Sequence, residues 1–239
     1  MFAQHGASSP LLANVFLHYV FDLRVQQWRG RNARGDVVVV RFADDLVVGF
    51  EHRTDAEQFL AALRERFAKF SLEPHAEKTR LIEFGRTVAR DRARRGLGRP
   101  ETFDFLGFTH ISGTSRKGGF QLQRHTMRKR MRAKLLEVNT ELQQRRHRPI
   151  REQGEWLASV VRGQCAYYAV PTNSRAVQRF RTGVVRHWRR ALEKCGQKHR
   201  LRWQRMNHLV NRSLPPARIA HPWPDTRFDV RTRAKNPVR

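Results

Sequence analysis

The stretch that most constrains the fold is a pair of adjacent carboxylates set between two runs of apolar residues. Four valines at 37–40 precede Asp44 and Asp45, and the apolar run 46–48 follows them. Such runs on both sides of a short polar break predict a β-hairpin with the acids at its tip. Adjacent ionised carboxylates repel each other, so a fold that keeps them together usually pairs them with a cation, and oxygen ligands suit Mg²⁺. Alone, an Ala-Asp-Asp segment is more typical of a solvated turn, so the interpretation depends on its surroundings.

The charge of the chain is concentrated in its C-terminal part. The 239 residues carry a net charge of +27; residues 1–85 contain 11 Lys+Arg and 11 Asp+Glu, whereas residues 86–239 contain 37 and 10. A segment this basic favours a polyanionic partner, and nucleic acid is the simplest one. An anionic membrane is the competing partner, but basic membrane helices need a free apolar face, and these faces are expected to pack against one another.

Neither a secretion signal nor a membrane span is indicated. No Lys or Arg precedes Arg24, and no uncharged apolar run reaches membrane-spanning length. Cys165 and Cys195 lack the Cys and His spacing of a zinc site, which favours free thiols in a reducing compartment. We therefore expect a cytoplasmic protein that associates with nucleic acid and not with a membrane.

The first part of the chain alternates between helix and strand patterns. A helix is predicted from Ser9 to about residue 28, with an apolar face that includes Leu11, Leu12, Val15, Phe16, Tyr19, Val20 and Leu23. Residues 54–57 have the spacing of a capping box for a second helix, and residues 79–84 alternate like a short strand. Asp22 and Asp36 are expected to be turn or surface acids. This order of elements predicts an α+β layer.

The second part of the chain predicts a basic helical bundle. Residues 86–100 are rich in Arg and Gly and are expected to form a flexible basic loop, residues 103–108 form a strand-like aromatic run, and Gly118-Gly119 marks a turn. Helices with apolar stripes are then expected from His125, at about 151–168, after Ser174 as far as Gly196, and at about 200–214. The proline-containing segment 221–239 is expected to be irregular.

Several motifs resemble, in order, those of the group II intron reverse transcriptases. They are QHGASSPLLAN at 4–14, FADD at 42–45, EKT at 77–79 and FLGF at 105–108. YYAVPTN at 167–173, HWRR at 187–190 and HPWP at 221–224 are similar to the thumb and maturase region of those proteins. The resemblance covers essentially the whole chain. It implies an α+β fold in which a partial polymerase palm at 1–110, a β-hairpin and a short antiparallel sheet packed with helices, precedes a basic α-helical thumb and maturase-type RNA-binding bundle at 111–239.

The resemblance also implies roles for individual residues. Asp44 and Asp45 match the catalytic metal-binding acids of an RNA-directed DNA polymerase, with Mg²⁺ as cofactor and Asp44 as a direct ligand. Lys78 matches a lysine near the leaving pyrophosphate, although a surface ion pair is an equally open role. Contacts to nucleic acid or nucleotide are implied at Gln4, Gly6, Phe42, Ala43, Leu106 and Gly107. His5 departs from the glycine of the family motif.

The implied partners are structured group II intron RNA, a DNA primer or target, and deoxynucleoside triphosphates. The family's palm also needs an Asp from a strand ahead of Gln4 that would lie beside residues 37–41, so the chain is expected to lack the fingers and one catalytic acid. It would then be inactive alone unless a separate N-terminal fragment supplies them. Two alternatives stay open: a non-catalytic maturase-like module that stacks bases on Trp203 or Tyr168, and a degenerate remnant without function.

Overall fold

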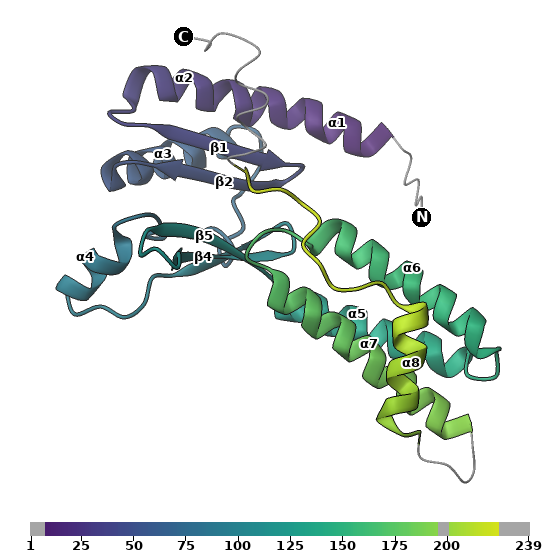
Figure 1. Ribbon diagram of the computed structural model, residues 1–239. Helices are drawn as coiled ribbons and strands as arrows, with labels where there is room; N and C mark the ends of the chain where they lie inside the picture. Colours follow the sequence, from purple (N-terminus) through teal and green to yellow (C-terminus); the bar gives the residue numbers. More distant parts are fainter. Residues whose placement is uncertain (1–7, 196–200, 225–239) are drawn as a thin grey trace, which may run out of the picture. The chain divides into compact units, whose positions relative to one another are not determined.

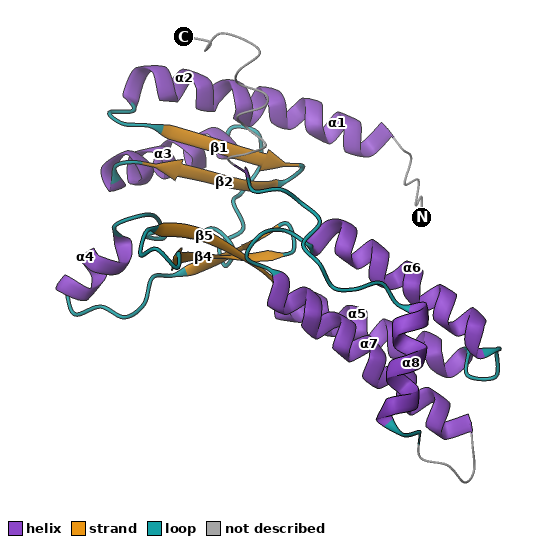
Figure 2. Cartoon of the chain, viewed as in Figure 1, coloured by secondary structure: helices purple, strands orange, loops and turns teal. Residues whose placement is uncertain are grey.

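The computed structural model describes residues 8–195 and 201–224, and the chain forms two compact units, one ending at Glu83 and one beginning at Phe84. Helices and antiparallel strands occur in both units, so the α+β class is confirmed (Figure 2). The predicted domain boundary at residue 110 falls within strand β4 (Phe108–Thr114) of the second unit.

The first unit begins with one long helix made of three segments. These are α1 (Ser8–Leu17), the π-helical segment η1 (His18–Asp22) and α2 (Leu23–Asn32), which follow one another without a break (Figure 1). The wider turn of a π-segment rotates the residues after it around the helix axis. The buried residues of this helix are Val20, Phe21, Val25 and Trp28.

The predicted apolar face of this helix is wrong over most of its length. Of its members only Val20 is buried, whereas Leu11 is 66% and Tyr19 61% exposed. The periodicity of the sequence assumed an uninterrupted α-helix, and η1 moves the buried face toward the C-terminal half. The N-terminal half therefore presents several exposed apolar side chains, although the ring of Phe16 contacts that of Phe70 (centroids 6.0 Å apart).

The predicted hairpin is confirmed. Strands β1 (Val37–Phe42) and β2 (Asp45–Phe50) pair antiparallel, with Phe42 opposite Asp45. Helix α3 (Arg53–Ala68) and the long helix both pack against the hairpin. The ring centroid of Phe59 in α3 lies 5.1 Å from that of Trp28 and 5.3 Å from that of Phe50. A small aromatic core thus supports the strands that lead to the acid pair.

Two local predictions for the first unit are wrong. Helix α3 starts at Arg53 after His52 without a side-chain cap, and Asp55 is buried and accepts a hydrogen bond from the Arg34 N–H (2.8 Å). The expected capping box is absent because Thr54 lies inside the helix and not at its N-cap, and Glu57 pairs with Arg53 (2.7 Å). Residues 79–84 form no strand, because in the described part of the unit β1 and β2 pair only with each other.

The second unit opens with a helix and a three-stranded meander. Residues 88–94 form α4 (Val88–Arg94), a correction to the expected loop; it buries no residue, so it could not show as an apolar stripe. Strands β3 (Thr102–Phe105), β4 and β5 (Phe120–Thr126) pair in sequence order, and the Gly118-Gly119 turn joins the last two.

A helical bundle follows, as predicted. It consists of α5 (Arg128–Gln144), α6 (Ile150–Tyr168), α7 (Ser174–Cys195) and α8 (Trp203–Ser213). The first begins three residues after the expected His125 because the chain up to Thr126 belongs to β5. Gly196 and Arg200, the expected ends of two helices, lie outside the described residues. No helix in the described ranges combines the length and the apolar character needed to cross a bilayer.

Buried polar groups connect the sheet to the bundle. Asn173 is fully buried; its Oδ1 accepts a hydrogen bond from the Thr126 N–H (3.0 Å), and its Nδ2 donates to Thr126 Oγ1 and to the Tyr168 carbonyl (2.8 Å each). One side chain thus joins the end of β5, the end of α6 and the start of α7. This accounts structurally for the Asn of the YYAVPTN motif.

Three histidines of the second unit have lowered pKa values. Burial is the main cause for His110, His125 and His187, and nearby arginines add to it. His110 also stacks on the ring of Phe103, with centroids 4.8 Å apart. The folded unit therefore binds fewer protons than the unfolded chain just below the ordinary histidine pKa of 6.5.

This protonation difference predicts acid sensitivity. Because the folded pKa values lie below the unfolded ones, the histidines do not oppose folding above about pH 6.5 and destabilise the unit increasingly as the pH falls below that value. We expect the free energy of unfolding, from urea titrations followed by tryptophan fluorescence, to fall between about pH 7.5 and pH 5.5. His110→Phe, which preserves an aromatic ring on Phe103, should reduce this pH dependence; an unchanged dependence would contradict the assignment to His110.

Candidate functional site

The acid pair lies at the tip of the β1–β2 hairpin. Asp44 occupies the two-residue turn with Ala43, Asp45 is the first residue of β2, and both acids are exposed. Ala43 has φ +53°, a left-handed conformation that residues with a Cβ rarely adopt. Phe42, 62% exposed, precedes it. The hairpin therefore brings four predicted site residues together on a short strained tip, where strain of this kind often accompanies function.

The side chain of Arg41 fixes this tip to the long helix. Its Nε and Nη2 donate to the two carboxylate oxygens of Asp22 at 2.9 and 2.8 Å, and Nη1 donates to Asn14 Oδ1 (2.9 Å) and to the Ala43 carbonyl (3.2 Å). One guanidinium thus joins η1, α1 and the turn. Bidentate pairing of this type fixes orientation as well as distance.

Asp22 is the residue that the sequence interpretation placed wrongly. Its side chain is 23% exposed and paired with Arg41, so it is not a turn or surface acid. Burial opposes its ionisation, but hydrogen bonds from Arg41 and His18 outweigh burial and hold the pKa of the Asp22 carboxyl below its usual value. Asp36, in contrast, is exposed ahead of β1 as expected.

The acid pair offers oxygen ligands of the kind that a divalent cation such as Mg²⁺ binds. Carboxylate oxygens are the ligands that Mg²⁺ prefers, and the tip presents two such groups side by side. Within residues 8–195 and 201–224, however, no group of three His, Cys, Asp or Glu side chains is arranged to hold a metal ion. The two carboxylates therefore fit a divalent cation whose remaining ligands come from outside the described residues.

The other candidate residues of the first unit lie apart from the hairpin in the chain. Lys78 is exposed in the turn at 76–78, where its N–H donates to the His75 carbonyl (3.1 Å). Gln4 and Gly6 fall outside the described residues. The roles of these three residues stay predictions.

Leu106 and Gly107 form the tight turn between β3 and β4, with φ +49° and +79°. Two tyrosines at the end of α6 hold this turn. The Tyr167 hydroxyl donates to the Leu106 carbonyl (2.8 Å), and a Cβ on Gly107 would lie 2.7 Å from the Tyr168 hydroxyl oxygen. The sequence indicates no contact between the motif that contains Leu106 and the motif that contains Tyr167, because the two lie about sixty residues apart and share no local pattern.

The packing of Tyr168 predicts a specific cost for enlarging Gly107. Gly107→Ala should lower the free energy of unfolding by about 2–3 kcal/mol, because it combines a left-handed φ with a steric clash. Gly118→Ala is the matched control: its φ is +81°, but nothing lies within 4 Å of the added Cβ. The control should cost only about 1 kcal/mol. Tyr168→Phe should recover part of the difference in urea titrations; equal costs at both glycines would contradict the clash.

The stacking candidates of the bundle differ in how open their rings are. Tyr168 packs against Phe108 and Tyr167, with ring centroids 5.1 and 4.8 Å apart. Trp203 is 47% exposed, and the guanidinium of Arg189 lies 4.4 Å from its ring centroid. Trp203 is therefore the more accessible of the two.

Part of the chain matches the model of a known family. Residues 4–110 match the family model for reverse transcriptase (RNA-dependent DNA polymerase). No curated protein matched the sequence. The matched segment contains both the acid hairpin and the Leu106-Gly107 turn, and it supports a reverse transcriptase, with nucleic acid as substrate, in this part of the chain.

Proposed function

We propose that this chain contributes the acid pair of an RNA-directed DNA polymerase of the group II intron type. The observation that carries the proposal is the placement of Asp44 and Asp45 at the tip of a braced hairpin inside the segment that matches the reverse transcriptase family. When bound, Mg²⁺ would activate the primer 3′-hydroxyl and neutralise the leaving pyrophosphate. The chain's own contribution is to hold two carboxylates in a fixed direction.

A third carboxylate from another polypeptide segment completes the site in this proposal. The described residues bring no third acid to the pair. The resemblance to the reverse transcriptase palm implies this third acid, and water and phosphate oxygens would fill the remaining positions around each Mg²⁺. In this proposal residues 1–239 supply two of the acids, and catalysis requires a further segment that provides the third carboxylate.

The second unit is proposed to grip the polynucleotide as a thumb and maturase-type region. The excess positive charge of the chain lies after residue 85, and the helices of this unit place apolar stripes inside and basic residues outside. Phosphate contacts of this kind bind tightly at low salt and weakly at high salt.

Primer extension tests the proposal. The purified chain 1–239 is incubated with an RNA template, a DNA primer, deoxynucleoside triphosphates and Mg²⁺, alone and with the polypeptide encoded directly upstream of it. We expect template-dependent DNA synthesis only in the combined reaction. Robust synthesis by the chain alone would refute the requirement for a third acid, and no synthesis in either reaction would refute the polymerase assignment.

A non-catalytic maturase-like module is the second candidate. It is favoured by the division into two compact units, because the helical unit has its own core and could bind structured intron RNA without the hairpin. Asp44→Ala distinguishes the two functions. If RNA affinity and splicing assistance survive and the combined reaction never yields DNA, the module is correct; if nucleotide addition is lost, the enzyme is correct.

A further inference from the structure

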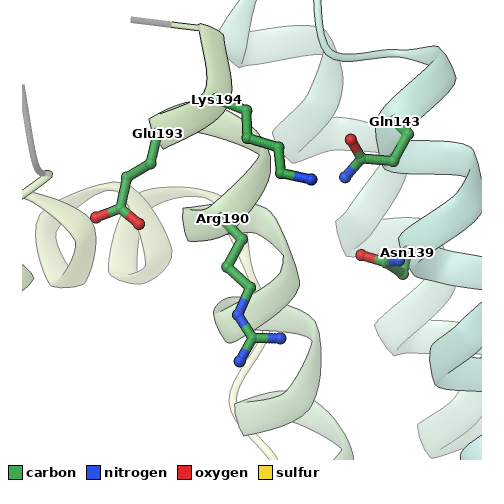
Figure 3. A pocket seen from close by; sticks show the side chains of 5 residues that line it. All are labelled: Asn139, Gln143, Arg190, Glu193 and Lys194. Atoms are coloured by element: carbon green, nitrogen blue, oxygen red, sulfur yellow. The ribbon is translucent and has the colours of Figure 1, made fainter. Parts of the chain in front are cut away.

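The surface between α5 and α7 contains a groove of about 450 Å³, and of its lining residues only Arg190 belongs to one of the sequence motifs, HWRR at 187–190. It is lined by Asn139 and Gln143 of α5 and by Arg190, Glu193 and Lys194 of α7. In Figure 3 the Lys194 ammonium points across the groove toward Gln143, and Arg190 lies one helical turn below it. Lys194 thus faces the Gln143 amide across the groove, while the Arg190 side chain extends along α7 on the same lining (Figure 3).

The acid in the lining is directed away from these groups. The Glu193 carboxylate lies on the opposite side of α7 from Asn139 and Gln143 (Figure 3), and it accepts hydrogen bonds from the Arg189 Nε and Nη2 at 3.1 and 2.9 Å. Its charge is therefore compensated by a neighbour outside the lining. Within residues 8–195 and 201–224, Arg190 and Lys194 form no ion pair, so their positive charge is available to a ligand.

The composition of the groove fits one chemical class of ligand. Amide N–H₂ groups donate hydrogen bonds to anionic oxygens, and Arg and Lys are the usual phosphate-binding residues. Arg190 and Lys194 are both exposed, so the groove is open to solvent, unlike a pocket that encloses a small molecule. An open groove that combines cations with side-chain amides suits a phosphate group within a polynucleotide backbone.

We propose that Arg190, Lys194, Asn139 and Gln143 form a binding site for a backbone phosphate of the nucleic acid held by the second unit. The site rests on the proposed function, and it specifies where on the bundle the strand is gripped. Because α5 and α7 pack along their lengths through residues such as Val138 and Val184, the two sides of the groove are held at a constant separation. The backbone positions that carry the four side chains are thus held at a fixed spacing around the proposed phosphate.

Equilibrium binding of the full chain to a labelled RNA hairpin, measured as a function of salt in the presence of EDTA, tests this site. Chelation removes any contribution of a cation at the acid hairpin. Arg190→Ala/Lys194→Ala should weaken binding about tenfold at moderate salt and lower the slope of log K against log salt by about 1 to 2. The matched control is Arg162→Ala/Arg212→Ala, which removes two exposed cations from α6 and α8; it should change the slope by less than half as much.

A variant without a change in charge distinguishes a site with specific hydrogen bonds from general electrostatic attraction of RNA to the bundle. Asn139→Ala/Gln143→Ala should weaken RNA binding about three- to tenfold while leaving the salt slope unchanged, because it removes hydrogen bonds and no charge. Thermal melts verify that each variant is folded. Competition by inorganic phosphate or pyrophosphate distinguishes a polymer site from a site for free phosphate. If the same concentration displaces RNA from the wild-type chain and from the control variant, the groove is a polymer site. If a low concentration displaces RNA from the wild-type chain alone, the groove is a site for free phosphate and the proposal is overturned.

The remaining outcomes are equally decisive. Equal losses in the groove and control double variants, or unchanged affinity in the amide variant, would overturn the groove as a phosphate site while leaving the polymerase proposal intact. Absence of RNA binding by the wild-type chain would overturn the groove and the grip assigned to the second unit together.

Discussion

Asp44→Asn is expected to reduce primer extension in the combined reaction by about 10³-fold or more, equivalent to about 4 kcal/mol of transition-state stabilisation. The substitution keeps the shape of the side chain and removes the charge that a metal ligand needs. Because Asp44 is exposed in a turn, the free energy of unfolding should change by less than about 0.5 kcal/mol. Rates of single-nucleotide incorporation and urea titrations measure the two effects separately.

The control for Asp44 is Asp36→Asn, which removes an exposed acid at the other end of the same hairpin. It should leave the rate of incorporation unchanged. RNA affinity should be the same for both variants and the wild-type chain, because the acid pair holds no phosphate unless a cation is bound. Comparable rate losses for both variants would show that overall charge, and not the tip, governs activity.

Arg41→Met is expected to lower the incorporation rate about 10- to 100-fold and the stability of the first unit by about 2 kcal/mol. The variant leaves the partly buried Asp22 carboxylate without its bidentate partner and releases the Ala43 carbonyl at the turn. The acid pair then loses its fixed direction relative to the long helix, and misplacement of a catalytic group by about 1 Å can cost about 10²-fold in rate.

A double-mutant cycle with Asp22→Asn tests this coupling. The double variant should be less impaired than the sum of the single variants, because removal of both partners leaves no uncompensated charge. Arg41→Lys should not restore the rate, since an ammonium cannot reproduce the bidentate fork. Arg53→Met, which removes an exposed pairing with Glu57, serves as the control. Strictly additive effects of Asp22 and Arg41 would contradict the coupling.

The sequence predicted well those elements whose residues carry a local periodic signal. Apolar runs around the acids predicted the β1–β2 hairpin, and apolar stripes predicted α5 to α8 because their buried faces, such as Leu157, Val161 and Trp188, recur at helical spacing. The helix α4 buries nothing and left no such signal. Residues 79–84 showed the opposite failure, since their alternation suggested a strand that has no partner in the described part of the first unit.

The features that position the candidate site could not be read from the sequence because they depend on contacts between distant segments. The π-segment places Asp22 opposite Arg41, nineteen residues away, and the tyrosines at 167 and 168 hold a turn sixty residues earlier. The positive φ of Ala43 could not be predicted from the sequence either, because a two-residue hairpin turn usually has glycine or asparagine at such a position. Sequence motifs predicted the candidate site residues, and the structure shows which contacts hold the hairpin and the turn that carry them.

We propose that the acid pair at the hairpin tip binds a divalent cation, and Mn²⁺ titration of the isotope-labelled full chain tests this binding directly. Bound Mn²⁺ broadens the amide signals of nearby residues in an NMR spectrum. The account predicts selective broadening at residues 42–46 that disappears in Asp44→Asn/Asp45→Asn. Broadening that is spread evenly along the chain, or that persists at the tip of this variant, would contradict it.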